Sequence, residues 1–301
     1  MSLTKSINLP AAVVEKQALL VAELAKLSSV IVAYSGGVDS SLLAYYARAV
    51  LKDRARIVIA LSPSLAQSEL LAARKQAELF NFDLLEIATE EVELSEYRRN
   101  DGMRCFFCKS TLFEYLQRLK VALSIDAIAY GANMDDLSDV RPGHKAAEKY
   151  HVVAPLMAAG LYKEEIRILA RAAGLPSFDR PQAACLSSRF PQNIYIDQER
   201  LAIVDQAEEG VRAFGFRQVR VRFKESEASV EIGQDELQLL KNRPQIAALI
   251  EEKLLKLGFS QVKIDPRGYR QGGANEPARN EQAGNEQAGN EQAGNEQVSN
   301  E

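Results

Sequence analysis

The sequence predicts an α/β protein built on a parallel sheet, with a second, smaller α+β domain towards its C-terminal end. Short apolar runs alternate with amphipathic segments over the first 180 residues, which is typical of parallel strands joined by right-handed crossover helices. One apolar run, at 30–34, breaks into a glycine pair and restarts as a helix. After residue 194 helices and strands follow in a different order, which indicates a separate domain.

Four strands are expected in the first domain, because four short runs are rich in apolar and β-branched residues. They are 30–34, 56–61, 83–88 and 127–131. Helices are expected where apolar residues recur at helical spacing. They are 11–27, the segment from the glycine pair to about Lys52, 66–80, 104–123 and 163–173, the last stopped by Gly174 and Pro176. Ligands bind beyond the carboxyl ends of parallel strands, so the loops after the first and fourth strands should face one crevice.

The smaller domain is expected to hold three strands and several helices. Its elements are a helix at 197–213, strands at 218–223 and 228–232, helices within 234–257 and a strand at 261–264. The first of these strands alternates apolar residues with Arg220 and Arg222. Because neighbouring side chains in a strand point to opposite faces, both guanidinium groups should leave the same face.

These patterns divide the chain into four segments. Residues 1–180 form the first domain and residues 194–270 the second. Between them, 181–193 is polar, contains two prolines and has no period, so it is interpreted as a linker that carries active-site residues. In 271–301 the unit Asn-Glu-Gln-Ala-Gly recurs every five residues without hydrophobic content, which predicts a disordered tail.

Composition and charge narrow the class of protein. The 301 residues include 37 basic and 41 acidic side chains, a net charge of −4, which gives no electrostatic footprint for bulk nucleic-acid binding. The N-terminal segment fits neither a signal peptide nor a membrane span, so we expect a cytoplasmic protein. Three cysteines in a reducing compartment argue against a disulfide framework and favour a metal or catalytic role.

The loop after the first strand, SGGVDSS at 35–41, has the composition of a phosphate cradle. Gly36 and Gly37 lack a Cβ, so backbone N–H groups can turn towards an anion at the start of the following helix. Hydroxyl groups are added by Ser35, Ser40 and Ser41. The spacing and lysine of the kinase and GTPase P-loop are missing. An ordinary glycine turn before a helix is the alternative.

Carboxylates accompany both loops of the expected crevice. Asp39 follows the glycines, where it could hold Mg²⁺ against a triphosphate or simply interact with the helix dipole. The loop at 131–143 adds more charged groups: Asp135, Asp136, Asp139 and Arg141. One or two of these are expected to serve nucleotide or metal, and the others to be solvated.

The three cysteines are Cys105 and Cys108, two residues apart, and Cys185 in the linker. The first two alone fit a metal pair, a redox pair or two buried small side chains. With Cys185 added, three thiolates suit a 4Fe-4S cluster with one open iron. Structural zinc would need a fourth ligand, which His144 or His151 could supply. A thioredoxin-like context for a redox pair is missing.

Arginines and serines near Cys185 and on the first strand of the smaller domain could bind an anionic substrate. They are Ser187, Ser188, Arg189, Arg220 and Arg222. Planar guanidinium groups match phosphate and carboxylate in a bidentate manner. The alternative is two exposed arginines on a strand face or in a subunit contact.

SGGVDSS resembles the PP-loop of N-type ATP pyrophosphatases, which have an adenine nucleotide alpha hydrolase-like fold and split ATP between its α and β phosphates. Together with GANMDDLSDVRPG, ACLSSRFP and VRVRF, it makes residues 10–270 similar to LarE, the sulfur transferase family of nickel-pincer nucleotide synthesis. The resemblance implies that carboxylates of a pyridinium dicarboxylate mononucleotide are adenylated with ATP and Mg²⁺ and become thiocarboxylates. It also implies a homo-oligomer, with a hexamer as the expected form.

The resemblance leaves the sulfur donor open between two branches of the family. In one branch the cysteine that matches Cys185 gives up its sulfur and is left as dehydroalanine. In the other, three cysteines hold a 4Fe-4S cluster that carries an extra sulfide supplied by a donor. Because Cys105 and Cys108 accompany Cys185, the cluster is the expected cofactor here.

Three other functions fit parts of the sequence. A tRNA thiolation enzyme with a PP-loop and a three-cysteine cluster is the closest, although the acidic net charge and the lack of a recognisable RNA-binding module speak against it. An ammonia-using PP-loop synthetase would leave the cysteines idle. A nucleotide-binding regulatory module would not need Asp39 and Cys185.

Overall fold

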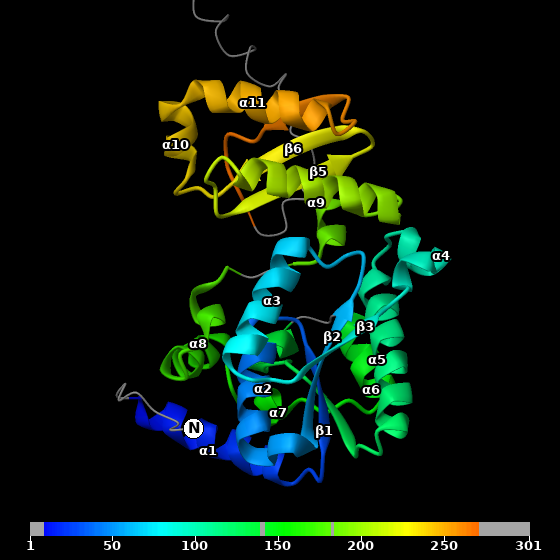
Figure 1. The fold of residues 1–301 in the computed structure, drawn as a ribbon, viewed down its shortest axis with the longest axis vertical. Coiled ribbons are helices and arrows are strands. Elements are labelled where there is room, and N and C mark those ends of the chain that lie inside the picture. Colours follow the sequence, from blue (N-terminus) through cyan, green and yellow to red (C-terminus); the bar gives the residue numbers. More distant parts are fainter. Residues whose placement is uncertain (1–8, 139–141, 182–183, 271–301) are drawn as a thin grey trace, which may run out of the picture.

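The computed structural model describes residues 9–138, 142–181 and 184–270, which form two units built on separate sheets (Figure 1). In the first sheet the strands are β1 (Val30–Tyr34), β2 (Ala55–Leu61), β3 (Leu84–Ala88) and β4 (Ala127–Tyr130). All are parallel, in the order β3-β2-β1-β4. The expected α/β fold with a parallel sheet is therefore confirmed.

Helices cover both faces of this sheet, which explains why its strands are mainly apolar. On one face Val30 and Val32 pack in a core with α1 (Ala11–Ala25), α2 (Val38–Leu51) and α3 (Gln67–Leu79). The same side holds α7 (Pro155–Ala158) and α8 (Lys163–Ala172). On the other face Ile31 packs with α5 (Arg104–Ala122) and α6 (Pro142–Lys149). The short helix α4 (Ser95–Arg98) precedes α5.

The second unit is a three-stranded sheet with helices, as the sequence predicts. Strands β5 (Val219–Lys224) and β6 (Glu227–Ile232) form an antiparallel hairpin, and β7 (Gln261–Ile264) pairs with β6 in parallel. Its helices are α9 (Gln198–Arg212), α10 (Leu237–Asn242) and α11 (Pro244–Leu255). These elements share one core, which also includes Ala66, Val92 and Tyr97 of the first unit. The domain limits at 180 and 194 stay predictions, and the tail at 271–301 lies outside the described residues.

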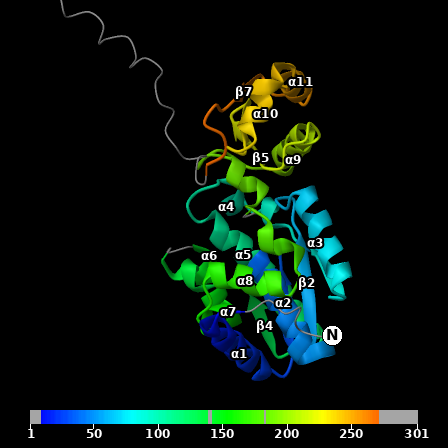
Figure 2. The ribbon, with the colours of Figure 1, turned by 90° about the vertical axis from the view of Figure 1, so that its left-hand side faces the viewer.

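The second unit sits at the end of the first where the strands leave the sheet (Figures 1 and 2). The loop after β2 contacts the segment that leads to it, because Ser64 O accepts a hydrogen bond of 2.8 Å from Leu186 N. In β5, Arg220 and Arg222 are 8% and 9% exposed. The alternative of two exposed arginines on a strand face is therefore wrong. Within the described residues no helix is long and apolar enough to cross a membrane.

Candidate active site

The PP-loop, residues 35–41, needs glycine because of its close neighbours. Gly36 has a φ of +76°, and a Cβ there would lie 2.7 Å from the Cβ of Ala73 on α3. Gly131, at the end of β4, lies so close to the PP-loop that a Cβ would stand 2.8 Å from Ser40 N. The loops after β1 and β4 therefore meet, as expected for one crevice.

The three PP-loop serines have different surroundings. Ser40 Oγ lies 3.0 Å from Ser35 Oγ and donates to Gly37 O at 3.1 Å, so it holds the turn together. Ser41 faces the interior, where its hydroxyl accepts a hydrogen bond of 2.6 Å from Gln76 of α3. Ser35 and both glycines line a pocket, whereas Ser40 and Ser41 shape the loop around it.

That pocket, about 120 Å³ in volume, combines the PP-loop with positively charged side chains. The cations are Lys163 and Arg167 of α8, and Arg180. Arg180 pairs with Glu69 at 2.6 Å, and Arg167 donates to Arg180 O at 3.1 Å. Ser177 also lines the pocket, and its buried Oγ lacks a hydrogen-bond partner among the described residues. Backbone N–H groups, cations and this hydroxyl suit a pocket for phosphate oxygens.

Asp39 lies at the mouth of this pocket, where the two crevice loops are joined. Its carboxylate forms an ion pair with Lys163 and accepts a hydrogen bond of 3.2 Å from Asn133 Nδ2. Asp135 accepts from Lys163 N at 2.6 Å, and Asp136 from Asn133 N at 3.1 Å, so both carboxylates have structural partners. Two further predicted groups, Asp139 and Arg141, lie outside the described residues.

The three cysteines converge from two distant segments. Cys105 and Cys108 lie on the first turns of α5, and Cys185 immediately precedes the 3₁₀ turn Leu186–Arg189. Burial raises the pKa of the Cys108 thiol well above its ordinary value, and the charges of Glu91, Cys185 and Cys105 raise it further. Cys105 and Cys185 are exposed. In the part of the chain that the structure describes, no three Cys, His, Asp or Glu side chains stand in an arrangement that would ligate one ion.

The two histidines weighed as zinc ligands lie on and after α6. His144 Nδ1 is 3.0 Å from the hydroxyl of Tyr130, at the end of β4. His151 is exposed, in the turn that follows α6.

Polar groups hold the cysteine segments together. Tyr97 and Ser187 share a buried hydrogen bond between their hydroxyls, and Arg104 Nη1 donates to Ser187 O at 2.7 Å. Burial raises the pKa of Tyr97, and the neighbouring Cys185 and Cys108 raise it further. The sequence does not mark Tyr97 and Arg104 as site residues, because a tyrosine and an arginine near the start of a helix carry no specific signal.

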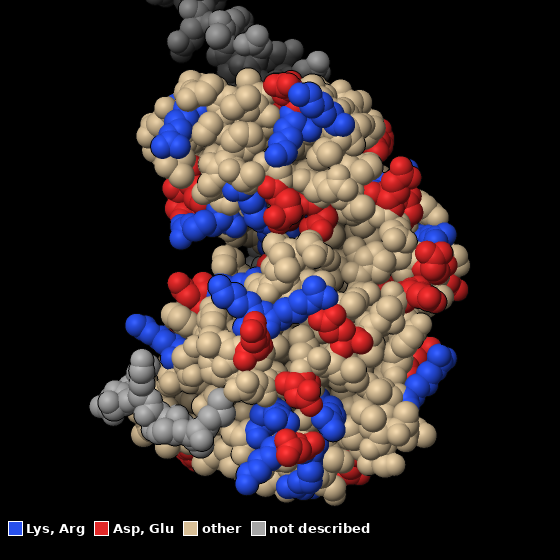
Figure 3. Space-filling model, viewed as in Figure 1, with Lys and Arg blue, Asp and Glu red and all other residues tan. Residues whose placement is uncertain are grey.

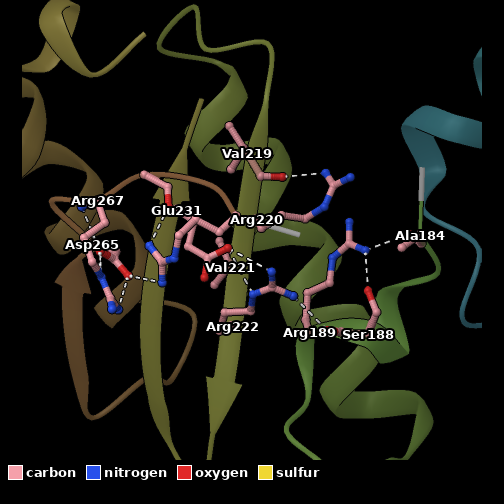
Figure 4. Close-up of polar contacts among 12 residues, drawn as sticks. Ala184, Ser188, Arg189, Val219, Arg220, Val221, Arg222, Glu231, Asp265 and Arg267 are labelled. Atoms are coloured by element: carbon pink, nitrogen blue, oxygen red, sulfur yellow. Dashed lines mark hydrogen bonds and ion pairs between the residues drawn. The ribbon is translucent and has the colours of Figure 1, made fainter. Parts of the chain in front are cut away.

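Arg189 is buried and supports the Cys185 loop from within (Figure 4). Its Nη1 donates to Ala184 O at 2.6 Å and to Cys185 O at 3.0 Å. Its Nε and Nη2 donate to Glu208 of α9 at 2.8 and 3.0 Å. Burial alone would raise the pKa of Glu208, but the charge and hydrogen bonds of Arg189 hold it below its ordinary value. This guanidinium therefore positions the loop.

The other predicted anion ligands surround the same loop (Figure 4). Arg222 donates to Ser188 O at 2.9 Å and pairs with Glu231 at 2.9 Å. Arg220 donates to Val219 O and stands 5.3 Å from the ring centre of Tyr269. Burial, and then the charge of Arg189, lower the pKa of Arg220, whereas the charge of Glu208 raises it.

The boundary between the two units is hollowed on one side, and Lys and Arg side chains gather on both of its rims (Figure 3). The PP-loop lies at the carboxyl edge of the first sheet, and the Cys185 loop joins that edge to the second unit. A nucleotide held at the first and a substrate held near the second would thus approach the same region.

Comparisons with known proteins found relatives that match most of the chain. No family model matches the chain. It is 38% identical over 250 residues to an uncharacterized protein of Synechocystis, covering 83% of this chain and 93% of that protein. It is 29% identical over 265 residues to the pyridinium-3,5-bisthiocarboxylic acid mononucleotide synthase of Lactiplantibacillus plantarum, covering 87% and 94%. An uncharacterized protein of Methanocaldococcus jannaschii is 28% identical over 245 residues, covering 81% and 92%.

Proposed function

The chain belongs to the LarE family, and on that premise we propose that it is a sulfurtransferase that converts carboxylates of a pyridinium dicarboxylate mononucleotide to thiocarboxylates with ATP. One observation carries the proposal beyond the family. A cation-lined PP-loop pocket and three converging cysteines lie at the same edge of one sheet. The first suits activation of a carboxylate, and the second suits delivery of sulfur.

The first step is adenylation. A carboxylate oxygen of the substrate attacks the α-phosphorus of ATP, the bond to the β-phosphate bridging oxygen breaks, and pyrophosphate leaves. The backbone of Gly36 and Gly37, with Lys163 and Arg180, stabilises the charge that develops on the leaving group. Asp39 faces this pocket and would hold Mg²⁺, which neutralises phosphate charge when bound.

The second step is sulfur transfer. A sulfur nucleophile attacks the carbonyl carbon of the acyl-adenylate, the bond from carbon to the AMP oxygen breaks, and AMP leaves with that oxygen. Two carboxylates require two such rounds. We propose that Cys105, Cys108 and Cys185 would hold a 4Fe-4S cluster, which when bound supplies an open iron for an exogenous sulfide.

The donor set suits such a cluster in number and kind, because α5 and the Cys185 loop together supply three thiols; since the described side chains are not arranged around a single ion, cluster binding would have to draw the thiols together. The raised pKa of Cys108 reflects in part the charges of Cys105 and Cys185, so a bound cationic centre would relieve the repulsion between the three thiolates. The alternative donor is Cys185 itself. In that case its sulfur attacks as a thiolate, and loss of the Cys185 α-proton with cleavage of its Cβ–S bond leaves dehydroalanine.

Arg220 is the strongest candidate for the substrate phosphate. It precedes Val221, whose backbone N–H donates to Glu208. It also lies near Arg189, which holds the Cys185 loop. The charges of Arg189 and Arg212 act on Arg220, so an anion bound near Arg220 would be stabilised by more than one guanidinium. A mononucleotide bound there would carry its pyridinium ring towards Cys185.

The test uses protein purified without oxygen, given ATP, Mg²⁺, sulfide and the pyridinium dicarboxylate mononucleotide. We expect AMP, pyrophosphate and thiocarboxylate, together with iron and acid-labile sulfide in the protein and an unchanged polypeptide mass after turnover. Cys105→Ala should remove the iron and spare pyrophosphate release. Colourless, iron-free protein that loses the elements of H₂S at Cys185 would contradict the cluster and support the self-sacrificing donor.

A further inference from the structure

Helix α9 crosses the boundary between the two units and uses one face to contact both halves of the site. Asp205, Glu208 and Arg212 are spaced three and four residues apart, so they lie on that face. In Figure 1, α9 of the second unit lies next to the end of α3 of the first. The contacts of Asp205 and Arg212 reach residues of α3 more than 100 positions earlier in the sequence, whereas Glu208 contacts the nearer Arg189.

Asp205 caps α3 from the other unit. Its Oδ2 accepts a hydrogen bond of 3.1 Å from Gln67 N, the first residue of α3. The residue at the cap position of α3 is Ala66, which has no side chain able to accept from the first turn. A carboxylate at a helix N-terminus also interacts favourably with the helix dipole. Arg212 adds a hydrogen bond of 3.3 Å to Ser68 Oγ.

Helix α3 in turn lies directly behind the PP-loop. Its Ala73 leaves no room for a side chain on Gly36, and Ala73 O accepts a hydrogen bond of 3.2 Å from the Tyr34 hydroxyl. Gln76 binds Ser41 at 2.6 Å. A displacement of α3 along its axis would therefore move the wall against which the PP-loop packs.

The same face of α9 holds the cysteine loop. Glu208, one turn after Asp205, binds Arg189 through two hydrogen bonds, and Arg189 binds the carbonyl oxygen of Cys185. The path from the PP-loop to Cys185 thus runs through α3, Asp205, one turn of α9 and Arg189.

We propose that Asp205 is a positioning residue that sets the PP-loop and the Cys185 loop at a fixed separation, so that an acyl-adenylate formed at the first lies within reach of sulfur at the second. Asp205 itself touches neither loop. The inference rests on the proposed function for its catalytic consequence, but the mechanical link that it describes does not depend on which reaction occurs.

The experiment compares Asp205→Ala and Asp205→Asn with Gln206→Ala, a control at the exposed neighbouring position. Asparagine caps a helix about as well as aspartate, so Asp205→Asn should behave as the wild type. In Asp205→Ala, AMP formation should stay within about twofold of wild type. The amount of thiocarboxylate formed per AMP should fall about fivefold, the factor that corresponds to the free energy lost with an average helix cap. Hydrolysis of the adenylate by water accounts for the AMP lost without sulfur transfer.

Hydrogen exchange supplies a readout that needs no activity. Asp205→Ala should raise exchange about fivefold at the amides of Gln67 and Leu186, and the other two variants should not. Equal losses of AMP and thiocarboxylate, an Asp205→Asn variant that behaves like the alanine variant, or unchanged exchange would overturn the inference. If the wild type makes no AMP but the exchange pattern holds, the proposed function fails and the link between the loops stands.

Discussion

Replacing Glu208 with alanine should destabilise the protein strongly, because its carboxylate lies at the centre of a buried ion-pair cluster. The carboxylate is 0% exposed and Arg189, its partner, 2%. Glu208 also accepts hydrogen bonds from Arg212 at 2.8 Å and from Val221 N at 3.1 Å. The variant leaves the Arg189 guanidinium buried without this countercharge, and breaking a buried pair in that way costs about 3–5 kcal/mol.

The loss of stability can be measured by thermal and denaturant unfolding of the wild type and variants. For a folded region of this size, about 2–4 °C of melting temperature accompanies each kcal/mol, so Glu208→Ala should melt roughly 6–20 °C lower. Glu209→Ala is the matched control on the same helix. Glu209 is 48% exposed and pairs with Arg212 at 2.6 Å, and a surface pair of this kind contributes at most about 1 kcal/mol. Similar losses from the two variants would refute the reasoning.

A double variant separates stability from positioning. Arg189→Met with Glu208→Leu removes both buried charges, and apolar replacements of a buried pair are often tolerated. It should therefore recover much of the stability lost in Glu208→Ala. The Cys185 loop still loses the hydrogen bonds that Arg189 gives to Ala184 O and Cys185 O, so sulfur transfer should remain impaired. Recovery of both stability and sulfur transfer would show that Arg189 does not position the loop.

Other predictions follow from single contacts. Gly36→Ala should abolish pyrophosphate release, because its φ of +76° and a Cβ contact of 2.7 Å leave no place for the methyl group. Lys163→Met should lower the rate of pyrophosphate release about 100-fold, as for loss of one charge-stabilising donor, whereas Lys26→Met, at an exposed site, should not. The pKa of Glu208 is lowered in the folded state, so its ionised form stabilises the protein above its unfolded pKa of about 4.3. This stabilisation is lost as pH falls through the folded pKa. In Glu208→Gln, the free energy of unfolding should therefore depend less on pH in the acidic range.

The strands of the first sheet could be predicted to within about one residue because both faces of the sheet are covered. The strands then read as mainly apolar runs, interrupted only by Arg56 in β2 and Glu86 in β3, and Val30–Tyr34 is buried along almost its whole length. Three short helices escaped prediction: α4, α6 and α7. One of four residues, such as α7, is too short to show a helical period.

The PP-loop could be recognised because its chemistry lies in one continuous segment, whereas the cations opposite it could not. Lys163, Arg167 and Arg180 come from segments more than 120 residues later, and a basic residue on an amphipathic helix is more often solvated than functional. The folding of β4 and α8 around α2 brings Lys163 to Asp39. The orientation of Ser41 was equally hidden, since it depends on Gln76 of a different helix.

The arginines of VRVRF show how a correct strand pattern can still leave a side chain's role open. Alternation correctly put Arg220 and Arg222 on a different face from their apolar neighbours, but it could not reveal that both faces of β5 are buried. Arg220 lies directly across from Glu231 in the hairpin, and Arg222 pairs with that carboxylate diagonally. A glutamate at that register in the following strand was the available signal that these charges face inwards.

Buried arginines in this number also bear on what the region binds. Arg189, Arg212, Arg220 and Arg222 gather around the Cys185 loop and β5, and their acidic partners are Glu208, Glu209 and Glu231. Ion pairs accompany the burial of Arg189 and Arg222, whereas the pKa of Arg220 is lowered mainly by its burial and then by the charge of Arg189. Guanidinium groups gathered in this way match the oxygens of an anion, and the phosphate of a mononucleotide would supply one near the Cys185 loop.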